Sequence, residues 1–188
     1  MRLVLATRNA HKLREFEGLL TGHEILALPD NVDLPPETAD TFAGNALGKA
    51  RAAFAATGRP AIADDSGIEA AALGGAPGVR SARYAGEDAG DTENLAKLLR
   101  EAPAGSPLAY VCALAYVDED GREQLVEGRC TGTLAGRPRG DGGFGYDPAF
   151  LPDDISDGRT MAELDPAEKD AISHRGRAAR ALLALLEG

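Results

Sequence analysis

The chain has 188 residues, a length that suits one compact domain or two closely packed lobes that share a core. Its 30 acidic residues outnumber the 20 Lys and Arg residues, and the resulting net charge of −10 argues against non-specific binding of a nucleic-acid backbone. No apolar run is long enough for a membrane span or for the core of a signal peptide. We therefore expect one cytoplasmic domain over residues 1–188, with neither nucleic acid nor membrane as a partner.

The N-terminal part of the chain predicts a strand, a helix and a second strand. Residues 3–6 form a short apolar run, and Leu13, Phe16 and Leu20 then recur at helical spacing. Residues 24–28 predict the next strand. A proline-rich, acidic segment follows it and is typical of an exposed loop.

Thr41 opens a second predicted helix. Its apolar residues recur every four positions and define one buried face: Phe42, Ala46, Ala50 and Phe54. Lys49 and Arg51 lie off that face, so we expect both of them on the surface. A Gly-Arg-Pro stop then leads into a short buried strand at residues 61–63. The glycines and the proline of residues 67–79 exclude one regular element there.

A further helix and a hairpin are predicted in the C-terminal half. Thr92 is the expected cap of a helix that reaches about Glu101. Residues 110–117 form a mostly apolar strand, residues 123–134 form an alternating one, and turn residues between them predict a long hairpin. The two cysteines, Cys112 and Cys130, lie in these strands without metal-ligand spacing, and we interpret both as small core residues.

Helices are predicted to end the chain. Thr160 with Glu163, and Asp165 with Glu168, are successive helix-start signatures. The last helix has an apolar face that we expect to be buried: Ala178, Leu182, Leu185 and Leu186. Because strands alternate with helices throughout, the fold class is α/β.

A first candidate site lies where the first strand meets the first helix. A helix N-terminus offers backbone N–H groups and the positive end of the helix dipole, so it can bind phosphate. Thr7 and Asn9 would add neutral donors there, and Lys12 would add a positive charge. An ordinary helix cap with a solvated lysine is the alternative, and this short pattern alone does not separate the two.

Asp64 and Asp65 form the second candidate site, directly after the short apolar strand, where open α/β folds place their ligands. Adjacent carboxylates repel each other unless a cation neutralises them, so we predict a hard divalent ion, Mg²⁺, with water completing its shell. A carboxylate beside the metal could also deprotonate an attacking water. The alternative is an acidic turn, which the apolar Ile62 and Ala63 disfavour.

Two further stretches predict contacts to a flat ring. Glycines cluster at residues 140–145, where small side chains let the backbone approach a ligand and the neighbouring aromatic residues could stack on it. Asp147 could accept a hydrogen bond from a ring N–H. His174 and Arg175, at the turn into the last helix, could donate to an exocyclic carbonyl oxygen. Core aromatics and a structural histidine are the alternatives.

Five motifs, in order over nearly the whole chain, closely resemble those of the inosine triphosphate pyrophosphatase family: residues 5–12, 63–67, 74–86, 142–148 and 173–176. The resemblance implies a house-cleaning hydrolase that converts ITP, dITP and XTP to the monophosphate and pyrophosphate. It also implies a magnesium-dependent homodimer. The implied fold is a long mixed sheet flanked by helices, in two lobes with the substrate in the cleft between them.

The resemblance assigns roles to individual residues. Asp65 is implied to be the general base and a metal ligand, Ser66 a substrate contact, and Lys49 a lysine near the phosphates. The triphosphate would be bound by the start of the first helix: Thr7, Arg8, Asn9, Ala10, His11 and Lys12. The base and sugar pocket would contain Phe144, Gly145, Tyr146, Asp147, Lys169, His174 and Arg175.

Gly44 departs from the family pattern, which commonly has an acid at this place. If that acid is a metal ligand, its role passes to Glu37, to Asp64 or to water, and Glu37 is our candidate. Two other functions stay open at this point. One is a Maf-like pyrophosphatase of modified nucleotides, and the other is a regulator that binds purine triphosphates without cleaving them.

Overall fold

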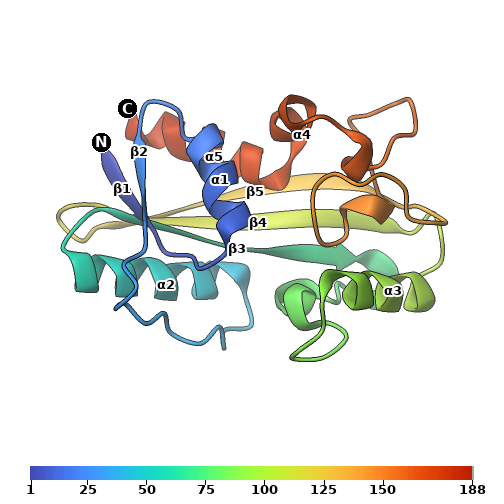
Figure 1. The fold of residues 1–188 in the computed structure, drawn as a ribbon, viewed down its shortest axis with the longest axis horizontal. Coiled ribbons are helices and arrows are strands. Elements are labelled where there is room, and N and C mark those ends of the chain that lie inside the picture. The colour runs from blue at the N-terminus through green and yellow to red at the C-terminus, as the bar shows by residue number, and fades with distance from the viewer. Residues whose placement is uncertain (188) are drawn as a thin grey trace. The chain divides into compact units, whose positions relative to one another are not determined.

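The computed structural model describes residues 1–187. Its strands are β1 Arg2–Leu5, β2 Glu24–Ala27, β3 Ala61–Ala70, β4 Pro107–Val117, β5 Glu123–Leu134 and β6 Phe150–Pro152 (Figure 1). Its α-helices are α1 Ala10–Leu19, α2 Phe42–Thr57, α3 Asp91–Glu101, α4 Pro166–Ile172 and α5 His174–Leu186. Short 3₁₀ turns are found at Ala71–Leu73, Gly78–Arg83, Asp147–Ala149 and Met161–Glu163.

The strands form a mixed sheet in the order β2-β1-β3-β4-β5-β6. β1 pairs in parallel with both β2 and β3, whereas β5 pairs antiparallel with β6. β4 and β5 are neighbours joined by a tight turn, in which the N–H of Asp118 donates to the carbonyl of Arg122 at 3.0 Å. So short a connection permits only an antiparallel pair. The predicted hairpin and the mixed α/β sheet are therefore confirmed.

The chain divides into two compact units. Unit 1 comprises Met1–Asp65, Cys112–Gly128 and the chain from Arg175 onward, and unit 2 comprises Ser66–Val111 and Arg129–His174. Because β3, β4 and β5 each run through both units, neither unit is one continuous stretch of sequence. The division is compatible with the predicted lobes, while the cleft between them and the single domain stay predictions.

In unit 1, the alternation of side chains along the strands builds two apolar layers. Leu3 and Leu5 of β1 lie in one buried cluster with Phe16 of α1 and Leu182 of α5. Val4 points the other way, into a cluster that contains the small buried residues of α2. Figure 1 accordingly shows α1 and α5 on one side of these strands and α2 on the other.

Unit 2 has its own apolar cluster, which includes Leu95 and Leu98 of α3 together with Phe150 of β6. Figure 1 shows α3 and α4 on opposite sides of the strands of this unit. Cys130 is fully buried in the cluster, and Cys112 is fully buried in unit 1; both are free thiols. The interpretation of both cysteines as core residues is confirmed.

Helix ends follow the predicted signals closely at α2 and α4. The Thr41 side chain accepts from the N–H of Gly44 at 3.1 Å, and Gly58 ends α2 in the left-handed conformation with φ 61°. At α4, the N–H of Glu168 donates to Asp165 at 2.8 Å and the N–H of Asp165 donates back to Glu168 at 3.0 Å. This reciprocal pair is the predicted capping box.

Several smaller predictions are wrong. The cap of α3 is Gly90 rather than Thr92. The signature of Thr160 and Glu163 is present as a capping box, but it opens only the 3₁₀ turn Met161–Glu163 and no α-helix, because the Asp-Pro start of the next helix follows at once. Leu185, expected on the buried face of α5, is 47% exposed. The short strand β6 was not predicted.

No helix within the described residues is long and apolar enough to cross a membrane.

The largest departure concerns β3. The predicted strand of residues 61–63 extends in the structure from Ala61 to Ala70, and residues beyond it form 3₁₀ turns. Asp64, Asp65 and Ser66 therefore lie inside a strand instead of following one. Polar residues are tolerated in a buried strand only when they find partners, and the identity of those partners defines the candidate site.

Candidate active site

Asp64 and Asp65 are consecutive residues of β3, so their side chains point to opposite faces of the sheet. Asp64 follows the direction of Ile62, which lies in the cluster of α1 and α5, and Asp65 follows that of Ala63, in the cluster of α2. Both are buried, at 1% and 6% exposure. The strand thus separates the two carboxylates and reduces the mutual repulsion from which the sequence predicts a metal ion.

Asp64 is neutralised by side-chain cations of unit 1. Lys12 Nζ lies 2.9 Å from its Oδ2, and Arg175 Nε lies 3.4 Å from the same atom. Burial raises the pKa of Asp64, but the charges of Lys12 and Arg175 outweigh this effect and hold the pKa far below its usual range. Asp64 is therefore ionised and ion-paired. Its assignment as a metal ligand stays a prediction.

Asp65 has a different environment on the α2 side. Asn45 Nδ2 donates to its Oδ2 at 2.9 Å, and this hydrogen bond is buried. Desolvation raises the pKa of Asp65 above its usual value, although the nearby charge of Lys49 and the bond from Asn45 oppose the shift. A carboxylate whose pKa is raised toward 7 by burial is suited to accept a proton.

Lys49 is buried, at 6% exposure, so its predicted surface position is wrong. Its Nζ lies 2.5 Å from Oε1 of Glu37. Burial lowers the pKa of Lys49, yet the charges of Asp64 and Glu37 more than compensate, and the pKa is raised. Lys49 thus keeps a positive charge inside unit 1, close enough to Asp65 to act on its pKa.

Gly44 lies in the first turn of α2, where the preceding loop closes on it. A Cβ at this position would lie 2.8 Å from Ala39 Cβ and 3.2 Å from Thr41 Oγ1, so a longer side chain requires the loop to move. The first turn of α2 contains no acidic residue. Glu37, in that same loop, is the carboxylate that faces Lys49 and raises the pKa of Asp65.

The carboxylates of Asp65 and Glu37 fit a magnesium site in which the substrate supplies some of the ligands. Within residues 1–187, no group of three or more His, Cys, Asp or Glu side chains is arranged to hold a metal ion. Mg²⁺ is commonly bound by one or two carboxylates, with water and substrate phosphates as the other ligands. Asp65 and Glu37 can supply two such carboxylates, and the protein does not need a closed cage of its own.

The start of α1 is capped by its own residues. Asn9 Oδ1 accepts from the N–H groups of His11 at 2.8 Å and Lys12 at 3.3 Å, and Thr7 Oγ1 accepts from the N–H of Asn9 at 3.1 Å. Three N–H groups of the segment predicted to face phosphate thus have partners within the segment itself. Binding of the triphosphate by residues 7–12 stays a prediction.

Arg8 has a structural task in this segment. Its guanidinium donates to the carbonyls of Leu28 at 3.0 Å, Pro29 at 2.8 Å and Val32 at 2.7 Å. These bonds tie the loop after β2 to the start of α1. These contacts alone account for an arginine at this position. The predicted role of Arg8 in substrate binding stays a prediction.

In unit 2, Asp147 is the centre of a hydrogen-bond network. Its Oδ2 accepts from Lys169 Nζ at 2.9 Å and from the N–H of Phe144 at 3.0 Å, and its Oδ1 accepts from the hydroxyl of Tyr110 at 2.9 Å. A Cβ on Gly143 would lie 2.1 Å from Oδ2 of Asp147, so only glycine fits there. Within the glycine cluster, Gly143 therefore leaves room for this network.

The two aromatic residues of the loop have different environments. Tyr146 is 5% exposed and donates to the carbonyl of Ser81 at 2.7 Å, so it is packed in the core of unit 2, and its contact with a ligand stays a prediction. Phe144 is partly exposed, with Lys169 Nζ 5.1 Å from its ring centroid. Gly145 donates its N–H to Asp91 at 2.8 Å. Stacking of Phe144 on a ligand stays a prediction.

His174 and Arg175 are neighbours in sequence with separate contacts. The ring of His174 stacks on that of Tyr110 in unit 2, with centroids 4.7 Å apart and an angle of 9° between the planes. Arg175, in unit 1, pairs with Glu15 at 3.0 Å as well as with Asp64. Ser66, the residue of β3 after Asp65, is partly buried. Base recognition by His174 and Arg175 stays a prediction.

Sequence reasoning missed several residues of these networks, among them Asn45 and Tyr110. Asn45 stands four positions before Lys49 on α2, so the two residues share a face of that helix. This polar pair within an alanine-rich helix was a signal that both are buried for a reason. Tyr110 lies in an apolar strand, and nothing local in the sequence identifies the partner of its hydroxyl group.

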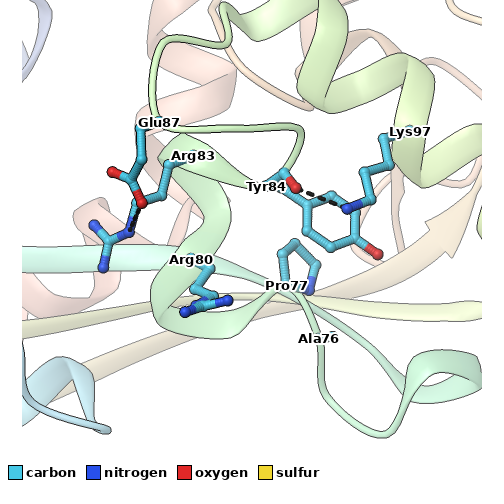
Figure 2. Close-up of a pocket in the computed structure, with 7 residues that line it drawn as sticks. All are labelled: Ala76, Pro77, Arg80, Arg83, Tyr84, Glu87 and Lys97. Atoms are coloured by element: carbon cyan, nitrogen blue, oxygen red, sulfur yellow. Dashed lines mark hydrogen bonds and ion pairs between the residues drawn. The ribbon is translucent and has the colours of Figure 1, made fainter.

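Figure 2 shows a pocket of about 250 Å³ in unit 2, lined by Ala76, Pro77, Arg80, Arg83, Tyr84, Glu87 and Lys97. Lys97 Nζ donates to the Tyr84 carbonyl at 2.9 Å and lies 4.3 Å from the centroid of its ring. Arg83 pairs with Glu87 at 3.7 Å. The lining includes part of the motif at residues 74–86 but none of the predicted catalytic or binding residues.

The chain is similar to known proteins over nearly its whole length. Residues 3–185 match the family model described as Ham1 family. The chain is 50% identical over 196 residues to a dITP/XTP pyrophosphatase of Mycolicibacterium paratuberculosis, covering 98% of this chain and 95% of that one. A dITP/XTP pyrophosphatase of Geobacillus kaustophilus is 52% identical over 186 residues, with coverages of 94% and 89%. The structure of a HAM1 protein from Coxiella burnetii matches with a TM-score of 0.89 at 41% identity, covering 100% of this chain and 98% of that one.

Proposed function

Because the chain belongs to the Ham1 family, we propose that it hydrolyses the deaminated purine nucleoside triphosphates ITP, dITP and XTP to the monophosphate and pyrophosphate. Such an activity removes deaminated purines from the nucleotide pool. The observation that carries the proposal is the environment of Asp65, a buried carboxylate held by Asn45 and accompanied by the buried cation of Lys49.

Asp65 is the proposed general base. Its raised pKa keeps it basic enough to take a proton from water, and the hydrogen bond from Asn45 holds one carboxylate oxygen in place. The water oxygen attacks the α phosphorus while the bond from that phosphorus to the α–β bridging oxygen breaks. The proton passes to Asp65, and the electron pair of the broken bond leaves with pyrophosphate.

Asp65 and Glu37 are the residues that we propose to hold Mg²⁺, and Asp64 is a further candidate. A divalent ion bound there would offset the charge of the phosphate oxygens and order them for attack. Lys49 already brings Glu37 into a defined position through their ion pair. The absence of an acid at Gly44 is what makes Glu37 the second carboxylate of this proposal.

Two lysines are proposed to offset the charge that develops on departing pyrophosphate, Lys12 and Lys49. Each is kept in place by a carboxylate, Lys12 by Asp64 and Lys49 by Glu37. A preformed cation of this kind does not need to be reorganised when the bond breaks. The start of α1 would complete the triphosphate contacts.

The base is proposed to lie against Phe144, with donors from His174 and Arg175 to its 6-oxo group. Adenine has an amine at that position and would lose this interaction. Guanine shares the 6-oxo group, so these donors alone do not reject GTP. A homodimer and a cytoplasmic location complete the proposal, and the homodimer rests on the family resemblance.

A panel of triphosphates tests the proposed function directly. We expect ITP, dITP and XTP to be cleaved far faster than ATP, with pyrophosphate as the primary product and with no turnover when Mg²⁺ is chelated. Orthophosphate as the primary product would contradict cleavage between the α and β phosphates. Preference for modified pyrimidine nucleotides would favour the Maf-like alternative, and binding without any product would favour the regulator.

The pH dependence of turnover tests the role of Asp65. A protonated Asp65 cannot accept a proton, so kcat/KM for ITP should fall as the pH drops through its pKa. Because burial raises that pKa, the fall should be centred above about pH 4, the usual value for Asp. Asp64, whose pKa is lowered, contributes no such fall in this range. A profile that stays flat down to about pH 4 would contradict a base with a raised pKa.

A further inference from the structure

Tyr110 of β4 joins several of the residues proposed to recognise the base. It is buried, at 6% exposure, and its hydroxyl donates to Oδ1 of Asp147 at 2.9 Å. The face of its ring lies parallel to the His174 ring at 4.7 Å between centroids, and the Phe150 ring lies at the same distance with an angle of 39°. One side chain thus contacts both Asp147 and His174.

The contact with Asp147 extends to two more residues. The hydroxyl of Tyr110 donates to Oδ1 of this carboxylate, whereas the ammonium of Lys169 and the N–H of Phe144 donate to Oδ2. An ionised carboxylate has about four acceptor positions, and three are used by these donors. The direction of the carboxylate, and with it the places of Phe144 and Lys169, therefore depends on donors at both of its oxygens.

The contact with His174 determines where an imidazole N–H can point. An imidazole donates in the plane of its ring, so a parallel neighbour that restricts the tilt of the ring also restricts the direction of its hydrogen bonds. Hydrogen bonds weaken steeply when donor and acceptor are misaligned. His174 can therefore donate to a 6-oxo group only while its ring keeps this orientation.

We infer that Tyr110 is a positioning residue for the base end of the substrate site, holding the Asp147 network through its hydroxyl and His174 through its ring. The inference rests on the proposed function. Tyr110 itself touches neither the phosphates nor the reacting atoms, so its loss should weaken binding of the purine and leave the chemical step nearly unchanged.

Tyr110→Phe removes the hydroxyl and keeps the ring. We expect the KM for ITP and the inhibition constant of IMP, which contains the base, each to rise about tenfold, the loss typical of one hydrogen bond to a charged group. The inhibition constant of pyrophosphate, which has no base, and kcat should each change less than about twofold. Tyr110→Leu also removes the stacked ring and should raise the IMP constant further.

Tyr116→Phe is the matched control. Tyr116 lies on the same strand, and its hydroxyl contacts Met1 Sδ at 3.8 Å, away from the proposed site residues. All of its constants should equal those of the wild type. Thermal unfolding of each variant is measured alongside, and Asp147→Asn approaches the same network from its other end if Tyr110→Phe fails to fold.

The outcomes separate two failures. If the wild-type protein cleaves no triphosphate, the proposed function is wrong. If it cleaves ITP but Tyr110→Phe behaves like Tyr116→Phe, the positioning role is wrong. Equal losses for IMP and pyrophosphate would show general destabilisation and would also overturn it. A selective loss for IMP and ITP supports the inference.

Discussion

Replacing Asp65 with Asn is expected to abolish turnover of ITP and to leave nucleotide binding largely intact. The amide is nearly the same size as the carboxylate but cannot take a proton from water, and loss of a general base typically costs about 10² to 10⁴ in rate. Loss of a proposed metal ligand adds to this effect. We expect kcat to fall at least about 10³-fold, measured by release of pyrophosphate. Calorimetric titration with ITP should still detect binding.

Glu69→Gln is the matched control for this variant. Glu69 belongs to the same strand, and its carboxylate pairs with Arg129 at 2.7 Å in unit 2. Removal of this charge should leave kcat within about twofold of the wild-type value, since exposed ion pairs contribute little. An Asp65→Asn protein with near-normal turnover would end the assignment of Asp65 as the base.

Those parts of the fold that depend on local chemistry were predictable from the sequence. The bounds of β5 at Glu123–Leu134 follow from alternation and turn residues, and the ends of α2 follow from a threonine cap and a left-handed glycine. The length of β3 was not predictable in this way. The strand contains polar residues beyond position 63 whose partners come from distant segments of the chain. A local pattern of apolar residues does not predict such partners.

The candidate site shows the same limit. Local patterns indicated Asp65 and Asp147, and the family resemblance added Lys49, but the surroundings of all three come from the folded chain. The predicted surface lysine is buried because Glu37 from the preceding loop pairs with it, and the predicted ligand aromatic Tyr146 is buried because its hydroxyl bonds to Ser81. Helical or strand periodicity reports which face is apolar, whereas burial of a polar group depends on a partner elsewhere.

Asp64→Asn should instead destabilise the fold strongly. The substitution removes the negative charge that pairs with both Lys12 and Arg175. Arg175, whose side chain is 7% exposed, then lacks one of its two carboxylate partners. Loss of one partner from a buried ion pair typically costs about 3–5 kcal/mol in the free energy of unfolding. Urea denaturation of the variant and the wild type at neutral pH measures the difference. A change below about 1 kcal/mol would show that Asp64 is not a structural centre.

The pH dependence of stability offers an independent check on Asp64. Its pKa is lowered in the folded state, so its contribution is present above the pKa of the unfolded chain, about 4, and is lost as the pH falls below that value. Asp64→Asn lacks this contribution. The acid side of its stability curve should therefore be flatter than that of the wild type.

Comparison of the two asparagine variants then separates the roles of two adjacent residues. Burial raises the pKa of Asp65, which means that its charge is less favourable in the folded protein than in the unfolded chain. Asp65→Asn should consequently be as stable as the wild type, or more so, and inactive. Asp64→Asn should be unstable, and whatever fraction stays folded should keep a competent base. Loss of stability in both variants, or in neither, would contradict the division of this pair by the two faces of β3.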